Sequence, residues 1–207
     1  MSFDPILDPV ERYYTAKVAE HGATAQGVDW NSQESQELRF SQLLKVAETS
    51  QPFSITDYGC GYGALVAYMR QRGDRYTYQG FDISEVMVER ARESFGSDPE
   101  CRFVVDRNDL EVSDIAVASG IFNVRLEATD ADWLVYVLAT INDLDRLGSK
   151  GFAFNALTKY SDADRMRPYL YYADPLYLFD YCKLHHSRNV ALLHDYGLFE
   201  FTIVVRK

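Results

Sequence analysis

Three glycines stand at alternate positions, Gly59, Gly61 and Gly63, between a short hydrophobic run and an amphipathic segment. Glycines at a strand-to-helix turn allow a tight backbone and let that backbone approach a ligand closely. Asp82 ends the next hydrophobic run, where a carboxylate can accept hydrogen bonds from both hydroxyls of a ribose. This spacing predicts a site for a nucleoside-containing ligand.

Asp57 narrows the choice of nucleoside, because it stands two residues before the first glycine. A dinucleotide site has the spacing G-x-G-x-x-G and holds a pyrophosphate at the helix N-terminus, whereas the spacing here is G-x-G-x-G. A carboxylate at this place would repel a pyrophosphate but suits a ligand with an ammonium group and no phosphate. S-adenosylmethionine is such a ligand, and an NAD-binding oxidoreductase is disfavoured.

The elements that must position these residues alternate between strand and helix patterns from residue 53 onward. A linker as short as the one between the last two strands makes an antiparallel hairpin rather than a crossover. We therefore expect an α/β fold: a mostly parallel seven-stranded sheet with helices on both faces and a C-terminal antiparallel β-hairpin. The strands are expected at residues 53–58, 76–81, 101–105, 115–122, 151–157, 190–194 and 199–205, and helices at 64–72, 84–95, 129–148 and 174–186.

The first 50 residues have helical patterns and are expected to cover the site, so that residues 1–207 form a single domain. Asp8-Pro9 can open a helix that ends at Gly22. Asn31 and Glu34 have the spacing of a capping box for a second helix. Between these helices lies Trp30, a large apolar residue that we expect to be buried.

The overall charge argues against several kinds of partner. The chain has 31 acidic and 21 basic side chains and a formal net charge of −10, which disfavours nucleic acid. No run approaches the roughly 18 apolar residues of a membrane span, and the acidic N-terminus does not resemble a secretory signal. Three scattered cysteines favour a reducing cytoplasm over a disulfide framework. No pattern indicates an oligomeric state.

Two blocks of the sequence resemble motifs of a known family. Asp57-Tyr-Gly-Cys-Gly-Tyr-Gly63 resembles the glycine-rich first motif of the class I S-adenosylmethionine-dependent methyltransferases, and Gly80-Phe-Asp-Ile-Ser-Glu, running on to residues 89–92, resembles their second. The order of elements is also similar, so the resemblance covers roughly residues 50 to 207. It implies a Rossmann-like fold and S-adenosylmethionine as the cofactor.

The resemblance also implies roles for individual residues. The glycine loop with Cys60 would face the methionine part of the cofactor, and Asp57 would contact its ammonium group directly or through water. Asp82 would bind the ribose, with Ile83 beside the adenine. Further cofactor contacts are expected from Asp106 (or else Asn108) near the adenine amino group and from Ser119 near the sulfonium. Arg39 lies before the first motif, where the resemblance implies no role, but from its helix it could reach the cofactor carboxylate. A surface salt bridge is the alternative for Arg39.

The acceptor site is expected beyond the fifth strand. The connection over residues 158–173 is longer than usual and follows the carboxyl end of a strand, where ligands bind. Its tyrosines combine apolar faces with hydroxyl groups, and its arginines could meet an anionic group; a tyrosine-rich packing loop is the alternative. The candidate substrate residues are Tyr169, Tyr171, Arg165 and, at the end of the fourth strand, Asn123.

Methyl transfer from a sulfonium requires alignment and exclusion of water, and it requires a base only when the acceptor must lose a proton. His194 and Tyr172 are the candidate catalytic groups, with a structural role as the alternative for His194. Cys182 and His185 lack the further ligands of a zinc site, so no metal is expected. The predicted function is transfer of a methyl group to a hydroxyl or amine of a small molecule. The alternative is a methyltransferase-like binding or partner subunit without catalysis.

Overall fold

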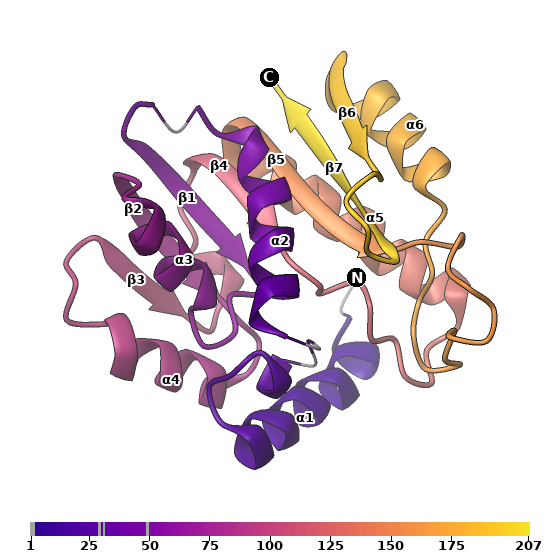
Figure 1. Ribbon diagram of the computed structural model, residues 1–207, viewed down its shortest axis with the longest axis horizontal. Helices are drawn as coiled ribbons and strands as arrows, with labels where there is room; N and C mark the ends of the chain where they lie inside the picture. The colour runs from indigo at the N-terminus through magenta and orange to yellow at the C-terminus, as the bar shows by residue number, and fades with distance from the viewer. Residues whose placement is uncertain (1–2, 29, 31, 49) are drawn as a thin grey trace.

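The computed structural model describes residues 3–28, 30, 32–48 and 50–207. At its centre is a seven-stranded sheet with the order β3-β2-β1-β4-β5-β7-β6 (Figure 1). The strands are β1 (Phe53–Tyr58), β2 (Tyr76–Phe81), β3 (Cys101–Val104), β4 (Ser113–Ala118), β5 (Gly148–Leu157), β6 (Asn189–Leu193) and β7 (Glu200–Arg206).

The first five strands pair in parallel, whereas β7 runs antiparallel to both of its neighbours, β5 and β6. The expected C-terminal hairpin is therefore confirmed. The sheet is mixed rather than mostly parallel, because the short β6–β7 connection reverses the chain and inserts β7 beside β5.

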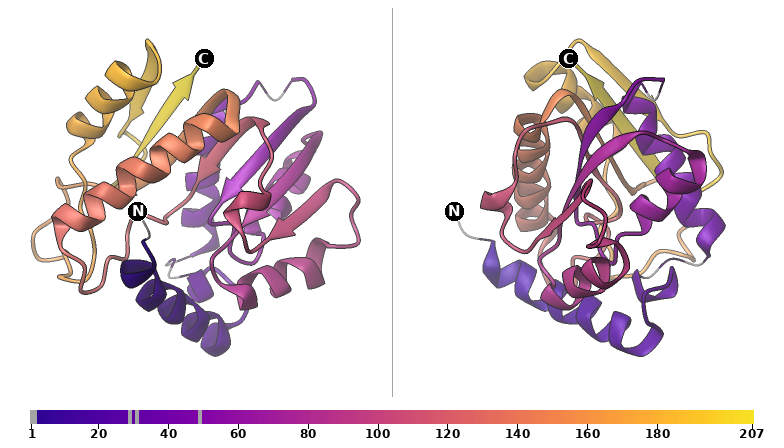
Figure 2. Two further views of the ribbon diagram at one scale, coloured as in Figure 1. Left: turned by 180° about the vertical axis from the view of Figure 1, so that it is seen from behind. Right: turned by 90° about the vertical axis from the view of Figure 1, so that its left-hand side faces the viewer.

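Helices cover both faces of the sheet, as Figure 2 shows for α5 on the face opposite α2 and α3. One apolar cluster joins the sheet to α5 and α6 through Trp133, Ile141 and Leu178. The other joins it to the helices of the opposite face through Leu43 and Met69. The helices are α1 (Asp4–His21), α2 (Gln33–Leu43), α3 (Ala64–Arg72), α4 (Glu85–Phe95), α5 (Asp130–Leu147) and α6 (Pro175–His185), with short 3₁₀ turns η1 (Gln26–Val28), η2 (Leu44–Val46) and η3 (Arg107–Asp109).

Side-chain caps explain why most helices begin where the sequence predicts. The Ser84 hydroxyl accepts from Met87 N–H, and the Thr129 hydroxyl accepts from Asp132 N–H. The Asp174 carboxylate caps α6, whose first residue is Pro175. Each cap satisfies a backbone donor that the helix itself leaves unpaired.

Several expected boundaries are wrong, among them the start of α1 and the end of β4. Helix α1 begins at Asp4 and contains Pro9, because Pro5 takes the favoured first-turn position. Strand β4 ends at Ala118 rather than at residue 122, because Gly120 has a left-handed φ of 75° that breaks the extended backbone. The expected cap Asn31 lies outside the described residues, and Ser32 caps α2. Among the described residues, no helix is long and apolar enough to span a membrane.

Candidate active site

Two adjoining cavities lie where β1, β2 and β4 end. The larger holds about 720 Å³ of space, including the part open to solvent. The smaller lies between the glycine loop and α2. Because they share lining residues, we treat the two cavities as one cleft. The shared residues are Val28, Trp30, Gly59, Gly61 and Ser119.

The glycine loop forms the floor of the cleft. Gly59, Gly61 and Gly63 have φ values of 87°, 53° and 86°, a region that residues with a Cβ rarely adopt. A Cβ added at Gly59 would lie 2.1 Å from the Ile121 side chain. Gly59 N–H donates to the Phe81 carbonyl at 2.7 Å, which fixes the loop to the end of β2. The predicted tight turn is therefore present, and it brings backbone directly to the cavity wall.

Asp82 lies at the larger cavity, directly after β2. One carboxylate oxygen accepts from Gly61 N–H at 2.8 Å and the other from Ser84 N–H at 2.9 Å. Burial raises the pKa of Asp82 to about 6, although these two hydrogen bonds lower it. Each oxygen has a further lone pair that can accept from a ligand hydroxyl. Ile83, half-exposed, lines the same cavity.

Asp57 is buried at the smaller cavity. Its carboxylate accepts from the Tyr78 hydroxyl at 2.9 Å. Burial raises the pKa of Asp57 to about 7, the Tyr78 hydrogen bond lowers it, and the negative charge of Asp82 raises it further. Burial also raises the pKa of the Cys60 thiol well above its usual value. The carboxyl group is thus placed where a positively charged ligand group would stabilise its ionised form.

Ser119 and Trp30 stand where the two cavities meet. The Ser119 hydroxyl oxygen is buried and has no hydrogen-bond partner among the described residues. Buried hydroxyls normally have a hydrogen-bond partner, so the unpartnered Ser119 hydroxyl indicates that a ligand group binds here. Trp30 lies against Gly120, where an added Cβ would be 2.4 Å from Trp30 Cζ2.

Arg39 does not reach the cleft. Its Nε and Nη2 donate to the two Glu200 carboxylate oxygens at 2.8 and 2.6 Å, and its Nη1 donates to the Ser35 carbonyl at 2.7 Å. Both partners of this ion pair are buried. The salt bridge is therefore buried and not on the surface, and Arg39 is not among the residues that line the two cavities.

Asp106 is exposed and caps η3, where it accepts from the backbone and side-chain N–H groups of Asn108 at 2.8 Å. Neither residue lines the cleft. The short turn after β3 uses the carboxylate for its own backbone, and the expected contact with the adenine stays a prediction.

The expected substrate and catalytic residues also lie outside the cleft lining. Tyr171 packs into the core, and the buried Asn123 side chain accepts from Leu157 N–H at 3.2 Å. The Tyr172 hydroxyl accepts from Arg167 N–H at 2.9 Å.

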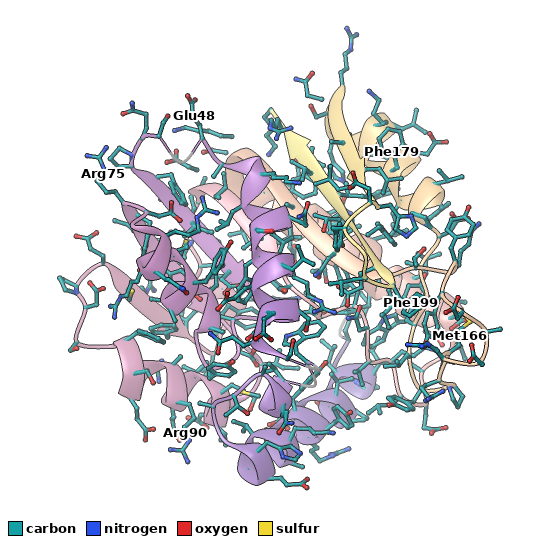
Figure 3. All side chains as sticks on the ribbon, viewed as in Figure 1. Glu48, Arg75, Arg90, Met166, Phe179 and Phe199 are labelled. Carbon is teal, nitrogen blue, oxygen red and sulfur yellow. The ribbon has the colours of Figure 1, made fainter. Side chains whose placement is uncertain are left out.

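The other three expected substrate and catalytic residues, Arg165, Tyr169 and His194, are more exposed. Arg165 lies 3.9 Å from the Asp162 carboxylate and over the ring of Phe199. Figure 3 shows Phe199 and Met166 on the right-hand side of the molecule, away from α3 and α4. Tyr169 is half-exposed, and His194 is exposed beside Tyr160. The structure does not bring these groups together with Asp57 and Asp82.

The first 50 residues were expected to cover the site, but sequence reasoning did not identify the residues of α1 that line it. Leu7, Val10, Glu11 and Tyr14 line the larger cavity. Their spacing of i, i+3, i+4 and i+7 is that of one helix face, a signal that could have indicated a buried surface. Glu11 accepts from the Thr15 hydroxyl, which in turn lies 2.8 Å from the Ser84 hydroxyl, so α1 is attached to the start of α4.

Comparisons with known proteins agree with this geometry. The family described as "Methyltransferase domain" matches residues 55–144. A Mycobacterium tuberculosis protein named "Putative methyltransferase Rv1506c" is 49% identical over 164 residues, which cover 79% of this chain and 99% of that protein.

Solved structures show the same fold at low sequence identity. The N-methyltransferase NodS from Bradyrhizobium japonicum, in complex with S-adenosyl-L-homocysteine, has a TM-score of 0.65 and 14% identity, covering 94% of this chain and 97% of that one. Human N-acetylserotonin methyltransferase in complex with S-adenosylmethionine has a TM-score of 0.66 and 15% identity, covering 100% of this chain and 60% of that one.

Proposed function

The chain belongs to the class I S-adenosylmethionine-dependent methyltransferases, and on that premise we propose that its cleft transfers the cofactor's methyl group to a hydroxyl or amine of a small molecule. The observation that carries the proposal is the placement of Asp57 and Asp82 at the two ends of one cleft, with the glycine loop between them.

The residues present fit the cofactor. Asp82, at the larger cavity, offers two carboxylate oxygens to the ribose hydroxyls, and the apolar surface beside it, including Ile83 and Met87, suits an adenine. Asp57, at the smaller cavity, would face the ammonium group. The unpartnered Ser119 hydroxyl lies between them, where the sulfonium joins the two halves of the cofactor.

The acceptor class is supported by the charges that line the cleft. Among the described residues its charged lining groups are Glu11, Asp57 and Asp82, all acidic, and no lysine or arginine is present. Nucleic acids and other phosphate-rich acceptors are bound mainly through cationic side chains. A neutral or amine-bearing small molecule therefore fits this lining better than a nucleic acid does.

When bound, the cofactor supplies an activated methyl group for an in-line displacement. The chain's own part is to orient the reactants and exclude water. The apolar face of α1 closes the larger cavity, and the hydrogen bond between Thr15 and Ser84 holds this helix in place. The glycine loop and Asp82 fix the position of the ribose end. Assembly of these parts before the acceptor binds would give the alignment that methyl transfer requires.

Calorimetric titration with S-adenosylmethionine, with NAD as the control ligand, tests the cofactor site. We expect binding of the first and none of the second, and no heat with S-adenosylmethionine would overturn the proposal. Incubation with methyl-labelled cofactor and a cell extract then tests the acceptor. Label in the small-molecule fraction supports the proposal, label in nucleic acid contradicts the acceptor class, and binding without any transfer supports a non-catalytic partner subunit.

A further inference from the structure

Trp30 is held from two sides by residues far away in the sequence. The guanidinium carbon of Arg39 lies 3.9 Å from the centroid of the indole. On another side, Gly120 has a φ of 75°, and an added Cβ there would be 2.5 Å from Trp30 Cη2. The indole therefore occupies the space that any side chain at position 120 would take.

The two residues that hold Trp30 are themselves joined through buried polar groups. Glu200 accepts from Arg39 and also from the Asn155 side-chain amide at 3.2 Å. The Asn155 side-chain oxygen, Oδ1, accepts from Gly120 N–H at 2.7 Å. The contacts thus form a closed circuit, which we call the Trp30 cradle: Arg39 of α2, Glu200 of β7, Asn155 of β5 and Gly120 of the β4–α5 turn. Buried networks with every member satisfied favour one arrangement.

Trp30 also lies where the proposed position of the cofactor places the sulfonium. In S-adenosylmethionine the sulfur is bonded both to the ribose-bearing carbon and to the amino-acid chain. If the ribose lies at Asp82 and the ammonium at Asp57, the sulfur lies where the two cavities meet. Trp30 is the aromatic member of the five residues that line both cavities.

The charge at this point changes during the reaction. The acceptor atom donates an electron pair to the methyl carbon, and the pair of the breaking S–C bond returns to sulfur. The sulfonium cation becomes a neutral thioether, and the acceptor gains the positive charge or releases a proton. An aromatic ring attracts a cation close to its face but not a neutral thioether to the same degree.

We propose that Trp30 makes the cleft selective for the charged, methylated cofactor over the neutral product, S-adenosylhomocysteine. The Trp30 cradle serves this role by fixing the indole, and Glu200 neutralises Arg39, so that no net positive charge stands behind the ring. This inference rests on the proposed function. It adds a specificity-determining residue and predicts that the spent cofactor is bound less tightly than the fresh one.

The experiment compares dissociation constants by calorimetry, so it needs no known acceptor. In Trp30→Leu we expect affinity for S-adenosylmethionine to fall about five- to thirtyfold and affinity for S-adenosylhomocysteine to change less than about twofold. Trp30→Phe keeps a smaller aromatic face, so its affinity for S-adenosylmethionine should lie between those of the unaltered protein and Trp30→Leu. Tyr177→Leu makes a similar aromatic-to-leucine change on the exposed surface of α6 and should alter neither affinity.

A second measurement leaves the side-chain shape nearly unchanged. The chain has only two tryptophans, Trp30 and Trp133, and Trp133 is fully buried outside the cleft. Biosynthetic replacement of both by fluorinated tryptophans weakens the attraction of the indole face for cations. The ratio of the two affinities should then fall stepwise with the number of fluorine atoms.

The outcomes separate the two proposals. If both cofactors weaken by the same factor in Trp30→Leu, and fluorination leaves their ratio unchanged, Trp30 only packs and the inference is wrong. If neither cofactor binds the unaltered protein, the proposed function fails instead. A selective loss of S-adenosylmethionine affinity supports the inference, and the fluorination series decides the matter even if Trp30→Leu does not fold.

Discussion

The cleft and the tip of the β5–α6 loop, residues 159–167, both lie beyond strand ends, yet they are held in different ways. Beside the cleft, contacts join distant segments: Arg39 and Glu200 are 161 residues apart and buried. At the loop tip most hydrogen bonds are local, as between Ser161 and Thr158. Lys159, where the tip begins, is the exception because it donates to the Asp174 carboxylate. Side chains such as Arg165 are exposed. Regions with few long-range contacts open at low free-energy cost. The cleft is therefore preformed, whereas the tip can change without disturbing it.

The largest expected effect comes from breaking the buried ion pair beside the cleft. Glu200→Ala leaves the Arg39 guanidinium buried without its partner, and such a loss typically lowers the free energy of unfolding by about 3–5 kcal/mol. Urea unfolding at constant pH measures it. Asp162→Ala removes the exposed partner of Arg165 at the loop tip and should change stability by less than about 0.5 kcal/mol. Equal losses in the two variants would contradict the comparison.

The next effect concerns cofactor affinity. Asp82→Ala removes the acceptor proposed for the ribose hydroxyls and should weaken S-adenosylmethionine binding by about 1–3 kcal/mol, or roughly five- to 150-fold. Asp82→Asn keeps one acceptor oxygen for the backbone N–H groups and should lose less. Calorimetry measures both. An unchanged affinity in Asp82→Ala would show that the ribose lies elsewhere.

Much of the framework around Asp82 could be predicted, because it is marked by local signals. The bounds of β1, α3 and β2 agree with the sequence analysis to the residue, since glycines, caps and runs of buried side chains mark their ends. Strand β4 begins earlier than expected, at Ser113. Ser113 can be buried because its hydroxyl forms a hydrogen bond with the Thr56 hydroxyl on β1. A partner on another strand cannot be recognised from the local sequence pattern.

The same reasoning explains what was missed in the site. The Asp57 and Asp82 positions follow from strand ends and register, so the sequence was sufficient to place them. The burial of Arg39 depends on Glu200 in the last strand, and the role of α1 depends on how that helix packs. The acceptor site was predicted at residues 158–173 because tyrosines are frequent there, but the frequency of a residue type does not indicate which side chains face a cavity.

A third effect concerns pH, because the pKa of Asp57 is raised to about 7 by burial. A bound ammonium group favours the ionised carboxylate, so S-adenosylmethionine affinity should rise severalfold as pH increases from 5.5 to 7. Asp57→Asn should bind more weakly and flatten this dependence. Titrations at several pH values measure it, and an affinity that falls as pH rises over this range would contradict the assignment.

The stability of the ligand-free protein should show the opposite trend. The folded state holds the Asp57 proton more tightly than the unfolded chain does, since the pKa rises from 3.8 to about 7. This contribution to stability is complete below about pH 4 and is lost as pH rises through about 7. Thermal unfolding of the unaltered protein and of Asp57→Asn at matched pH values separates it from other titrating groups.

The smallest expected effect is at the loop tip. Arg165→Ala removes an exposed side chain whose contacts are with Asp162 and the Phe199 ring, so stability should change by less than about 0.5 kcal/mol and cofactor affinity should not change. If the tip contacts the acceptor, as the sequence predicts, only the KM for that acceptor should rise. A change in cofactor affinity would instead show that the tip is coupled to the cleft. The two regions would then act as one unit, which their separate hydrogen-bond networks argue against.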